Sequence, residues 1–366
     1  MRLVTALWLC LALVDQVQAA PRLGLLGAYD VPKDLAVDGA PFGGISGIDY
    51  DPSTGDWLMI SDDRSDKAPA RFYRVRLTYD ARGVSAFSLK SSASLRRQDG
   101  ETFPPTKSPE GERADAEALR RDPLDGQIVW ASEGDAARGF DPAVRRTAAS
   151  GAPLGAVPLP AGLAFDPRSL SGARPNLTIE GLSFSPDGRS LWVSMEAPLI
   201  QDGPTSSVAA GGLTRITRLN RQGGVRAQYA YRLDPIQAAP AAGMRVDNGI
   251  SEILAVDSHR LLVLERSGVE VRKGHFTFHC RLYLVDTNQG QDIAARESLA
   301  SGPVRPLAKR LLVNLAKLET VDAGNLEAMA WGPRLRDGRR TLVLMADDNF
   351  DPDSPGAVLV FSVAGL

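Results

Sequence analysis

The sequence predicts an all-β protein that forms a single β-propeller with five four-stranded blades; six blades are the alternative. Three observations lead to this fold. A hairpin pattern occurs five times, its copies begin roughly 60 to 75 residues apart, and strand-like segments fill the intervals. Regular repeats of one small unit are typical of radial arrays, whereas a β-sandwich would not explain the period.

The clearest copy of the hairpin is Thr178 to Pro198, in which two apolar strands flank the turn Pro186-Asp187-Gly188. Turn residues between two β-rich segments are the usual signal of a hairpin. The remaining copies lie at residues 44–64, 116–134, 249–266 and 325–349. Each copy is expected to supply two strands of a blade.

Two more strands are needed to complete each blade. Strand-like segments follow the first, third and fourth copies, and the weaker segment Ala143 to Leu159 follows the second. After the fifth copy only Ala357 to Val363 remains, so Leu23 to Tyr29 is predicted to complete the last blade and close the ring. A sixth, degenerate blade would have to lie within Ser91 to Arg113 or Gly151 to Arg174.

Residues 1–20 have the pattern of a secretory signal peptide. Arg2 precedes an apolar run of 12 residues, which is short for a membrane span, and Ala19 and Ala20 offer small residues for cleavage. We therefore expect residues 21–366 to be exported, to the periplasm or the medium, as one propeller domain. No later stretch is apolar enough to span a membrane. The net charge of −2 argues against a nucleic-acid partner.

Only one cysteine, Cys280, remains once the signal peptide has been removed. An internal disulfide and a cysteine-ligated zinc site are therefore excluded. Cys280 lies in a segment of alternating apolar residues and is expected to be a small core residue.

Carboxylates recur at the open end of the hairpins, opposite the turns. One set opens the first strand and comprises Glu117, Glu180, Glu252 and Glu327, with Ser46 in the first copy and Glu252 displaced by one position. A second set follows the second strand and comprises Asp62, Asp63, Glu133, Glu196, Glu265, Asp347 and Asp348. Antiparallel pairing is expected to place both sets at the same rim of the ring.

Carboxylates held close together raise one another's pKa or recruit cations, and ligand sets made only of oxygen suit Ca²⁺. We predict Ca²⁺ as cofactor, with the metal ligands Asp62, Asp63, Glu180, Glu196, Asp347 and Asp348. The alternative is that these acids are solvated or pair with nearby arginines.

Arginines and further glutamates complete the predicted site. Arg64 and Arg266 directly follow the acids of their copies and are expected to hold an anionic group such as phosphate. Glu117, Glu252 and Glu327 are candidates for a general base, and the sequence does not choose among them.

Ordered motifs run across nearly the whole mature chain. These are Gly44-Ile45-Ser46-Gly47-Ile48, Ser61-Asp62-Asp63-Arg64, Glu117-Ala118-Leu119, Glu180-Gly181-Leu182, Ser194-Met195-Glu196, Ile250-Ser251-Glu252, Leu264-Glu265-Arg266, Asn325-Leu326-Glu327-Ala328-Met329 and Asp347-Asp348-Asn349-Phe350. In these motifs the chain resembles the phytase-like propeller family, described as "esterase-like activity of phytase". The family name implies hydrolysis of phosphate or carboxylic esters, and related propeller phytases use Ca²⁺ at an acidic rim.

Two functions from different classes fit these observations. The first is an exported, Ca²⁺-dependent ester hydrolase that acts on a small anionic ester, with phosphate monoesters as the expected substrates. The second is a non-catalytic exported propeller that binds a ligand or a protein at the same rim, since a fold does not determine a function. Release of product from an ester distinguishes the two.

Overall fold

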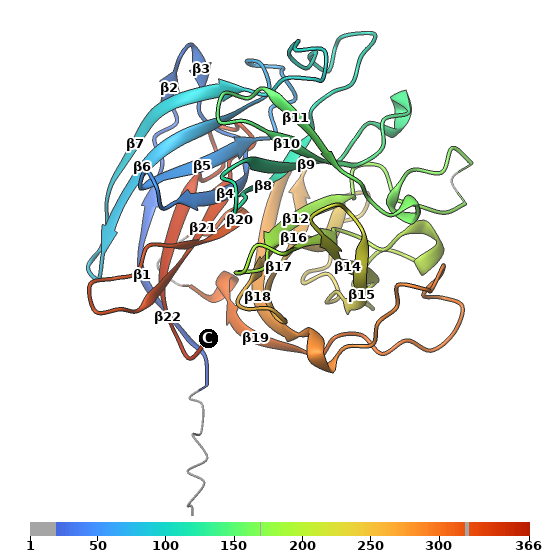
Figure 1. The fold of residues 1–366 in the computed structure, drawn as a ribbon. Coiled ribbons are helices and arrows are strands. Elements are labelled where there is room, and N and C mark those ends of the chain that lie inside the picture. The colour runs from blue at the N-terminus through green and yellow to red at the C-terminus, as the bar shows by residue number, and fades with distance from the viewer. Residues whose placement is uncertain (1–19, 169, 319–321) are drawn as a thin grey trace, which may run out of the picture.

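A computed structural model describes residues 20–168, 170–318 and 322–366. The chain forms five four-stranded antiparallel sheets arranged around a central axis (Figure 1). This confirms the predicted five-bladed propeller. The segments 91–113 and 151–174 supply no further sheet within the described residues, so the sixth blade is absent there.

Four blades are continuous in sequence, and in each the first strand lies innermost, next to the innermost strands of its neighbours. Blade 1 contains β4 (Ile45–Asp51), β5 (Asp56–Ser61), β6 (Arg71–Asp80) and β7 (Gly83–Ser94). Blade 2 contains β8 (Ala116–Arg121), β9 (Ile128–Ser132), β10 (Ala143–Thr147) and β11 (Pro153–Val157). Blade 3 contains β12 (Ile179–Phe184), β13 (Ser190–Met195), β14 (Leu213–Asn220) and β15 (Val225–Arg232). Blade 4 contains β16 (Val246–Ala255), β17 (Arg260–Arg272), β18 (His275–Asp286) and β19 (Lys309–Asn314).

Blade 5 joins the two ends of the described chain. It contains β20 (Asn325–Gly332), β21 (Arg340–Asp347), β22 (Ala357–Ala364) and β1 (Arg22–Asp30). β1 pairs antiparallel with β22, from Arg22 opposite Ala364 to Asp30 opposite Ala357. The predicted closure by the N-terminal strand is therefore confirmed. A short hairpin of β2 (Ala36–Val37) and β3 (Ala40–Pro41) follows β1.

The core lies between neighbouring blades. Trp57 and Tyr73 of blade 1 pack with Ala328 and Val343 of blade 5 in one apolar cluster. Cys280 of blade 4 belongs to a second cluster, on the other side of blade 5, and is buried as predicted. Apolar area removed from water between the blades therefore holds each sheet against the next.

A β-bulge interrupts every innermost strand, near its start in four blades and at the middle of β16 in blade 4. The pairing register slips between residues 45 and 47, 116 and 118, 179 and 181, 250 and 252, and 326 and 328. The extra residues are Ser46, Glu117, Glu180, Ser251 and Glu327. A bulge bends the strand and redirects the side chain of the extra residue. The same position is therefore redirected in all five blades.

Among the described residues, no helix has the length and apolar character that crossing a membrane requires. The predicted signal peptide lies outside the described residues except for Ala20. Its cleavage and the export of the chain stay predictions.

Candidate functional site

A cavity of about 610 Å³ opens at one end of the propeller axis. Carboxylates from all five blades line it: Asp62 of blade 1, Glu117 and Glu133 of blade 2, Glu180 and Glu196 of blade 3, Asp247 of blade 4, and Glu327 and Asp347 of blade 5, together with the loop residues Asp322, Asp351 and Asp353. Arg64, Arg245 and Arg266 line the same cavity. The cavity is therefore strongly polar and carries both signs of charge.

The repeated hairpin explains why these acids meet. Glu117, Glu180 and Glu327 are the bulged residues of β8, β12 and β20. The partner acids stand where each second strand ends, as Glu133 does after β9 and Glu196 after β13. The start of one antiparallel strand lies beside the end of the next, so each hairpin brings its two acids together.

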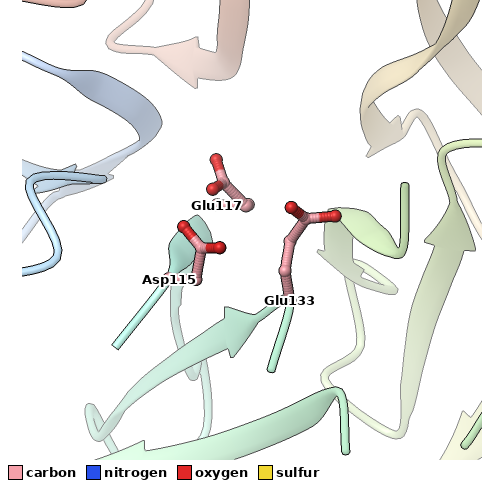
Figure 2. Close-up of side chains that lie close together, drawn as sticks. All are labelled: Asp115, Glu117 and Glu133. Carbon is pink, nitrogen blue, oxygen red and sulfur yellow. The ribbon is translucent and has the colours of Figure 1, made fainter. Parts of the chain in front are cut away.

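Two groups of three carboxylates are close enough to hold a metal ion. Asp115, Glu117 and Glu133 form one group, and Glu133, Glu180 and Glu196 form the other. Within each group, one oxygen from each residue lies within 4.8 Å of the others. Figure 2 shows the first group, whose carboxylates converge from neighbouring strand ends. Glu133 belongs to both groups, so the two candidate positions are adjacent.

Burial and crowding raise the pKa of these carboxyl groups. Burial raises the pKa of Asp115 to about 7 against the opposing charge of Arg64. Burial, followed by the charge of Glu117, also raises the pKa of Glu133 to about 7. Burial and then the charges of Glu117 and Glu196 raise the pKa of Glu180 well above its ordinary value. Ionising all of these groups at neutral pH requires a compensating positive charge.

Among the described residues, Glu180 has no hydrogen-bond or ion-pair partner, although it is only 6% exposed. Its charge acts on Arg266 only from a distance, as one of several carboxylates that raise the pKa of that guanidinium. A buried carboxylate without a donor or a cation is costly. An all-oxygen set that contains such a residue fits a hard cation such as Ca²⁺. The donor set is therefore able to hold a metal ion.

The arginines are held in place by acids of the cavity. Arg266 donates from Nη2 to Glu196 Oε1 at 3.0 Å and from Nη1 to Glu327 Oε1 at 3.0 Å. Arg64 donates to Asn176 Oδ1 at 3.1 Å and forms an ion pair with Asp115. Burial opposes protonation of Arg266, but the surrounding carboxylates outweigh it and raise the pKa of Arg266 well above its usual value.

The structure does not bring Asp63 and Asp348 into the cavity. Asp63 forms a buried ion pair with Arg71 and accepts from the Lys67 backbone N–H at 2.9 Å. Asp348 accepts from Lys33 Nζ at 2.8 Å and from the Gly44 backbone N–H at 2.9 Å. Consecutive residues of extended chain point to opposite sides, so only Asp62 and Asp347 of the two Asp-Asp pairs line the cavity.

Glu252 is also separated from the cavity. The bulge of β16 is at Ser251, so Glu252 lies one residue further along the strand. Its side chain is fully buried and lies 2.6 Å from Arg120 Nη2, in an ion pair. Glu252 is therefore engaged by Arg120 and does not line the cavity with Glu117 and Glu327.

Arg120 and Glu252 connect all five innermost strands across the axis. Arg120 of β8 donates to the carbonyl oxygens of Ile48 in β4 at 2.7 Å, Ile253 in β16 at 3.2 Å and Met329 in β20 at 3.1 Å. Glu252 accepts from the Leu182 backbone N–H of β12 at 3.1 Å. We call this Arg120–Glu252 pair the axial ion pair.

Several acids that the structure places in or beside the site are not among the ligands predicted from the sequence, including Glu133, Asp115 and Asp247. Glu133 belonged to the recurring set but was not chosen as a ligand. Asp115 and Asp247 have no counterpart in most copies of the hairpin, so the repeat gave no signal for them. The spacing Asp115-x-Glu117 was a usable signal, because alternate residues of a strand point to the same side.

Fold and site together define a class: a five-bladed β-propeller whose axial cavity is lined by carboxylates and arginines. The chain belongs to the phytase-like family with the description "Esterase-like activity of phytase", whose model matches residues 40–350. This confirms the resemblance found in the hairpin motifs. A search of curated proteins found no match.

Three solved structures show weak overall similarity to the chain. Penicillium chrysogenum α-L-arabinanase in complex with arabinobiose is 12% identical, with a TM-score of 0.41 and coverage of 89% of this chain and 79% of that one. A glucose dehydrogenase is 14% identical, with a TM-score of 0.35 and coverage of 92% and 98%. The Dos1 propeller is 8% identical, with a TM-score of 0.34 and coverage of 88% and 68%. Similarity at this level carries no argument about function.

Proposed function

We propose that this protein is an exported hydrolase of phosphate monoesters that uses Ca²⁺ held by the carboxylates of the axial cavity. The observation that carries the proposal is that one cavity holds both the fixed arginine Arg266 and the buried Glu180, which has no hydrogen-bond or ion-pair partner among the described residues. Membership of a family described by an esterase-like activity supports an ester as substrate.

The group Glu133, Glu180 and Glu196 is assigned to the cation, with Asp62 and Asp347 in the same cavity as further oxygen donors. When bound, Ca²⁺ supplies positive charge that keeps these carboxylates ionised and attracts an anionic ester. The assignment keeps four of the six ligands expected from the sequence and adds Glu133.

Arg266 and Arg64 are assigned to the phosphate group. Both guanidinium groups line the cavity, and their acidic partners fix them before a substrate arrives. A planar guanidinium with several N–H donors matches the oxygens of a phosphate. These arginines would orient the ester in a cavity whose own carboxylates repel it.

Glu117 is assigned to accept the proton of the attacking water. Glu327 is less suited, because its Oε1 already accepts from Arg266 and from Asn325 Nδ2 at 2.8 Å. Glu252 is engaged by Arg120 outside the cavity. Glu117 lines the cavity beside the assigned cation group, where proton transfer requires a group within hydrogen-bond reach.

Two measurements test the proposal. The first is a thermal melt of the protein with EDTA and then with Ca²⁺. The second is the release of phosphate from p-nitrophenyl phosphate and of acetate from p-nitrophenyl acetate. Ca²⁺ at a hundredfold excess over its dissociation constant should stabilise the wild type by roughly 3 kcal/mol. Glu180→Gln should lose most of this stabilisation and lower phosphate release at least about tenfold, because one ligand charge is removed. The matched control is Asp337→Asn, an exposed acid in the β20–β21 turn.

Two outcomes count against the hydrolase. Stabilisation by Ca²⁺ without turnover of either ester would support the cation site but favour a propeller that only binds its ligand. The absence of both stabilisation and turnover would overturn the cation site and the reaction together. Export is tested separately by N-terminal sequencing of the protein recovered outside the cytoplasm, which should begin at Ala20 or Pro21.

A further inference from the structure

Blade 4 carries a hairpin that extends further than those of the other blades. β17 has 13 residues, whereas the second strands of the other blades have 5 to 8. β18 has 12 residues, whereas the third strands of the other blades have 5 to 10. β17 and β18 stay paired beyond Arg266, from Ser267 opposite His279 to Arg272 opposite His275. Residues 274–278 of this extension line the axial cavity.

The extension adds an apolar surface to a cavity that is otherwise polar. Phe276 and Phe278 lie two residues apart on one strand, with ring centroids separated by 6.0 Å and ring planes 21° apart. The guanidinium carbon of Arg245 lies 5.0 Å from the centroid of Phe276. Phe278 also packs against the core between blades 4 and 5, but Phe276 belongs to none of the apolar core clusters.

Hydrogen bonds hold this surface in place. Glu270 accepts from the backbone N–H groups of Arg245 at 2.8 Å and Gly274 at 2.7 Å, which fixes the tip of the hairpin. Asp247 accepts from the Gly268 backbone N–H at 2.9 Å and ties β16 to β17. A surface that is ordered before binding loses little conformational entropy when a ligand arrives.

We propose that Phe276 and Phe278 form a subsite for the alcohol portion of the substrate, which makes the preferred substrate a phosphate monoester of an alcohol that carries an aromatic ring. This inference rests on the proposed hydrolase function. The acids and arginines of the cavity suffice for the phosphate group and need no aromatic neighbour. Arg245 covers one face of Phe276, and the electropositive edges of the phenyl rings pair well with the π face of another ring.

The test compares benzyl phosphate with ethyl phosphate, because both leaving groups are simple primary alcohols and only one carries a ring. The wild type should hydrolyse benzyl phosphate with the higher kcat/KM. Phe276→Ala should lower kcat/KM for benzyl phosphate about tenfold, since one aromatic contact is lost. Its kcat/KM for ethyl phosphate should stay within about twofold of the wild-type value. Val271→Ala is the matched control on the same hairpin, because Val271 is 58% exposed and does not line the cavity.

A binding measurement separates this subsite from the hydrolase itself. Benzylphosphonate and ethylphosphonate lack the hydrolysable ester, and calorimetry on the Ca²⁺-loaded protein measures their affinities. Tighter binding of benzylphosphonate, lost in Phe276→Ala, supports the subsite even if no ester is turned over. Three outcomes would overturn the subsite, even if phosphate esters are hydrolysed. The wild type could bind both phosphonates equally well, Phe276→Ala could keep the preference for benzylphosphonate, or neither phosphonate could bind.

Discussion

Buried carboxyl groups of the axial cavity are poorly compensated by the protein itself. Arg266 pairs with Glu196 and Glu327, and Arg64 pairs with Asp115, but Glu180 has no partner among the described residues. Like charges in a buried site retain protons or bind cations. Protons and Ca²⁺ are therefore expected to compete for the same oxygens.

Without a divalent cation, the protein should lose stability as the pH rises from about 5 to about 8. In the unfolded chain, Asp and Glu ionise near pH 4, whereas folded Asp115 and Glu133 have a pKa of about 7. Between these values the folded state binds more protons than the unfolded state, so raising the pH favours unfolding. Their contribution is fully present below about pH 4 and is lost as the pH passes through about 7.

The measurement is the melting temperature in EDTA across this pH range, repeated with saturating Ca²⁺. The decline should be smaller with Ca²⁺, because the cation compensates the ionised carboxylates. A melting temperature in EDTA that rises steadily from pH 5 to pH 8 would contradict the assigned pKa shifts.

Side-chain chemistry was more predictable from the sequence than side-chain direction. Glu117, Glu180 and Glu327 recur at one position of the hairpin, so their meeting in one cavity followed from the repeat. Asp63 and Asp348 are carboxylates like the adjacent Asp62 and Asp347, but they accept hydrogen bonds from backbone N–H groups outside the cavity. A repeat identifies which residue types recur, whereas the local backbone decides which of two adjacent carboxylates faces the axis.

At the scale of the element, the bulge in each innermost strand determines which side chain of that strand is redirected. The innermost strands are buried at nearly all successive positions, so they show no alternation that an extra residue would interrupt. The sequence therefore predicted the strands but not the bulges. β17 is also longer than the repeat predicts, because the fourth copy of the hairpin pattern ends at Arg266 whereas the strand continues to Arg272. Two glycines, Gly47 and Gly181, directly follow the extra residue of their strands. A Cβ at either would meet the innermost strand of the next blade, 2.6 Å from the nitrogen of Leu119 for Gly47 and 2.8 Å from the nitrogen of Ile253 for Gly181.

Gly47→Ala should destabilise the protein by roughly 1–3 kcal/mol, the usual cost of an overpacked position. A Cβ at Gly47 would lie 2.6 Å from the backbone nitrogen of Leu119 on β8, and a backbone atom cannot move aside as a side chain does. Urea unfolding measures the change in free energy. The matched control is Gly162→Ala, which has no atom within 4 Å of the added Cβ. Equal midpoints for the two variants would show that the innermost strands tolerate a wider spacing.

For the whole molecule, the ring is closed in two places. At the outer edge, β1 pairs with β22, and this closure was predictable because the fifth copy lacked a strand. At the axis, the axial ion pair joins strands of all five blades. The sequence could not predict the second closure, since Arg120 occurs in only one copy and its acceptors are main-chain carbonyls of distant segments.

Breaking the axial ion pair should destabilise the fold without removing the cation site. Arg120 is 3% exposed and Glu252 is fully buried, so removing one partner leaves a buried charge, which typically costs about 3–5 kcal/mol. Glu252→Gln, which keeps the size of the side chain, should therefore lower the free energy of unfolding in urea. Its melting temperature should still rise with Ca²⁺, because Glu252 does not line the axial cavity.

The double variant Arg120→Leu with Glu252→Leu tests whether the axial ion pair also stabilises the fold through its hydrogen bonds to the other blades. Replacing both partners of a simple buried pair by apolar residues often restores stability. Here the carbonyls of Ile48, Ile253 and Met329 would lose their donor, and a buried polar group without a partner costs about 1–3 kcal/mol. The double variant should therefore stay well below the wild type in urea. Recovery to wild-type stability would mean that the blades hold their positions through apolar packing alone.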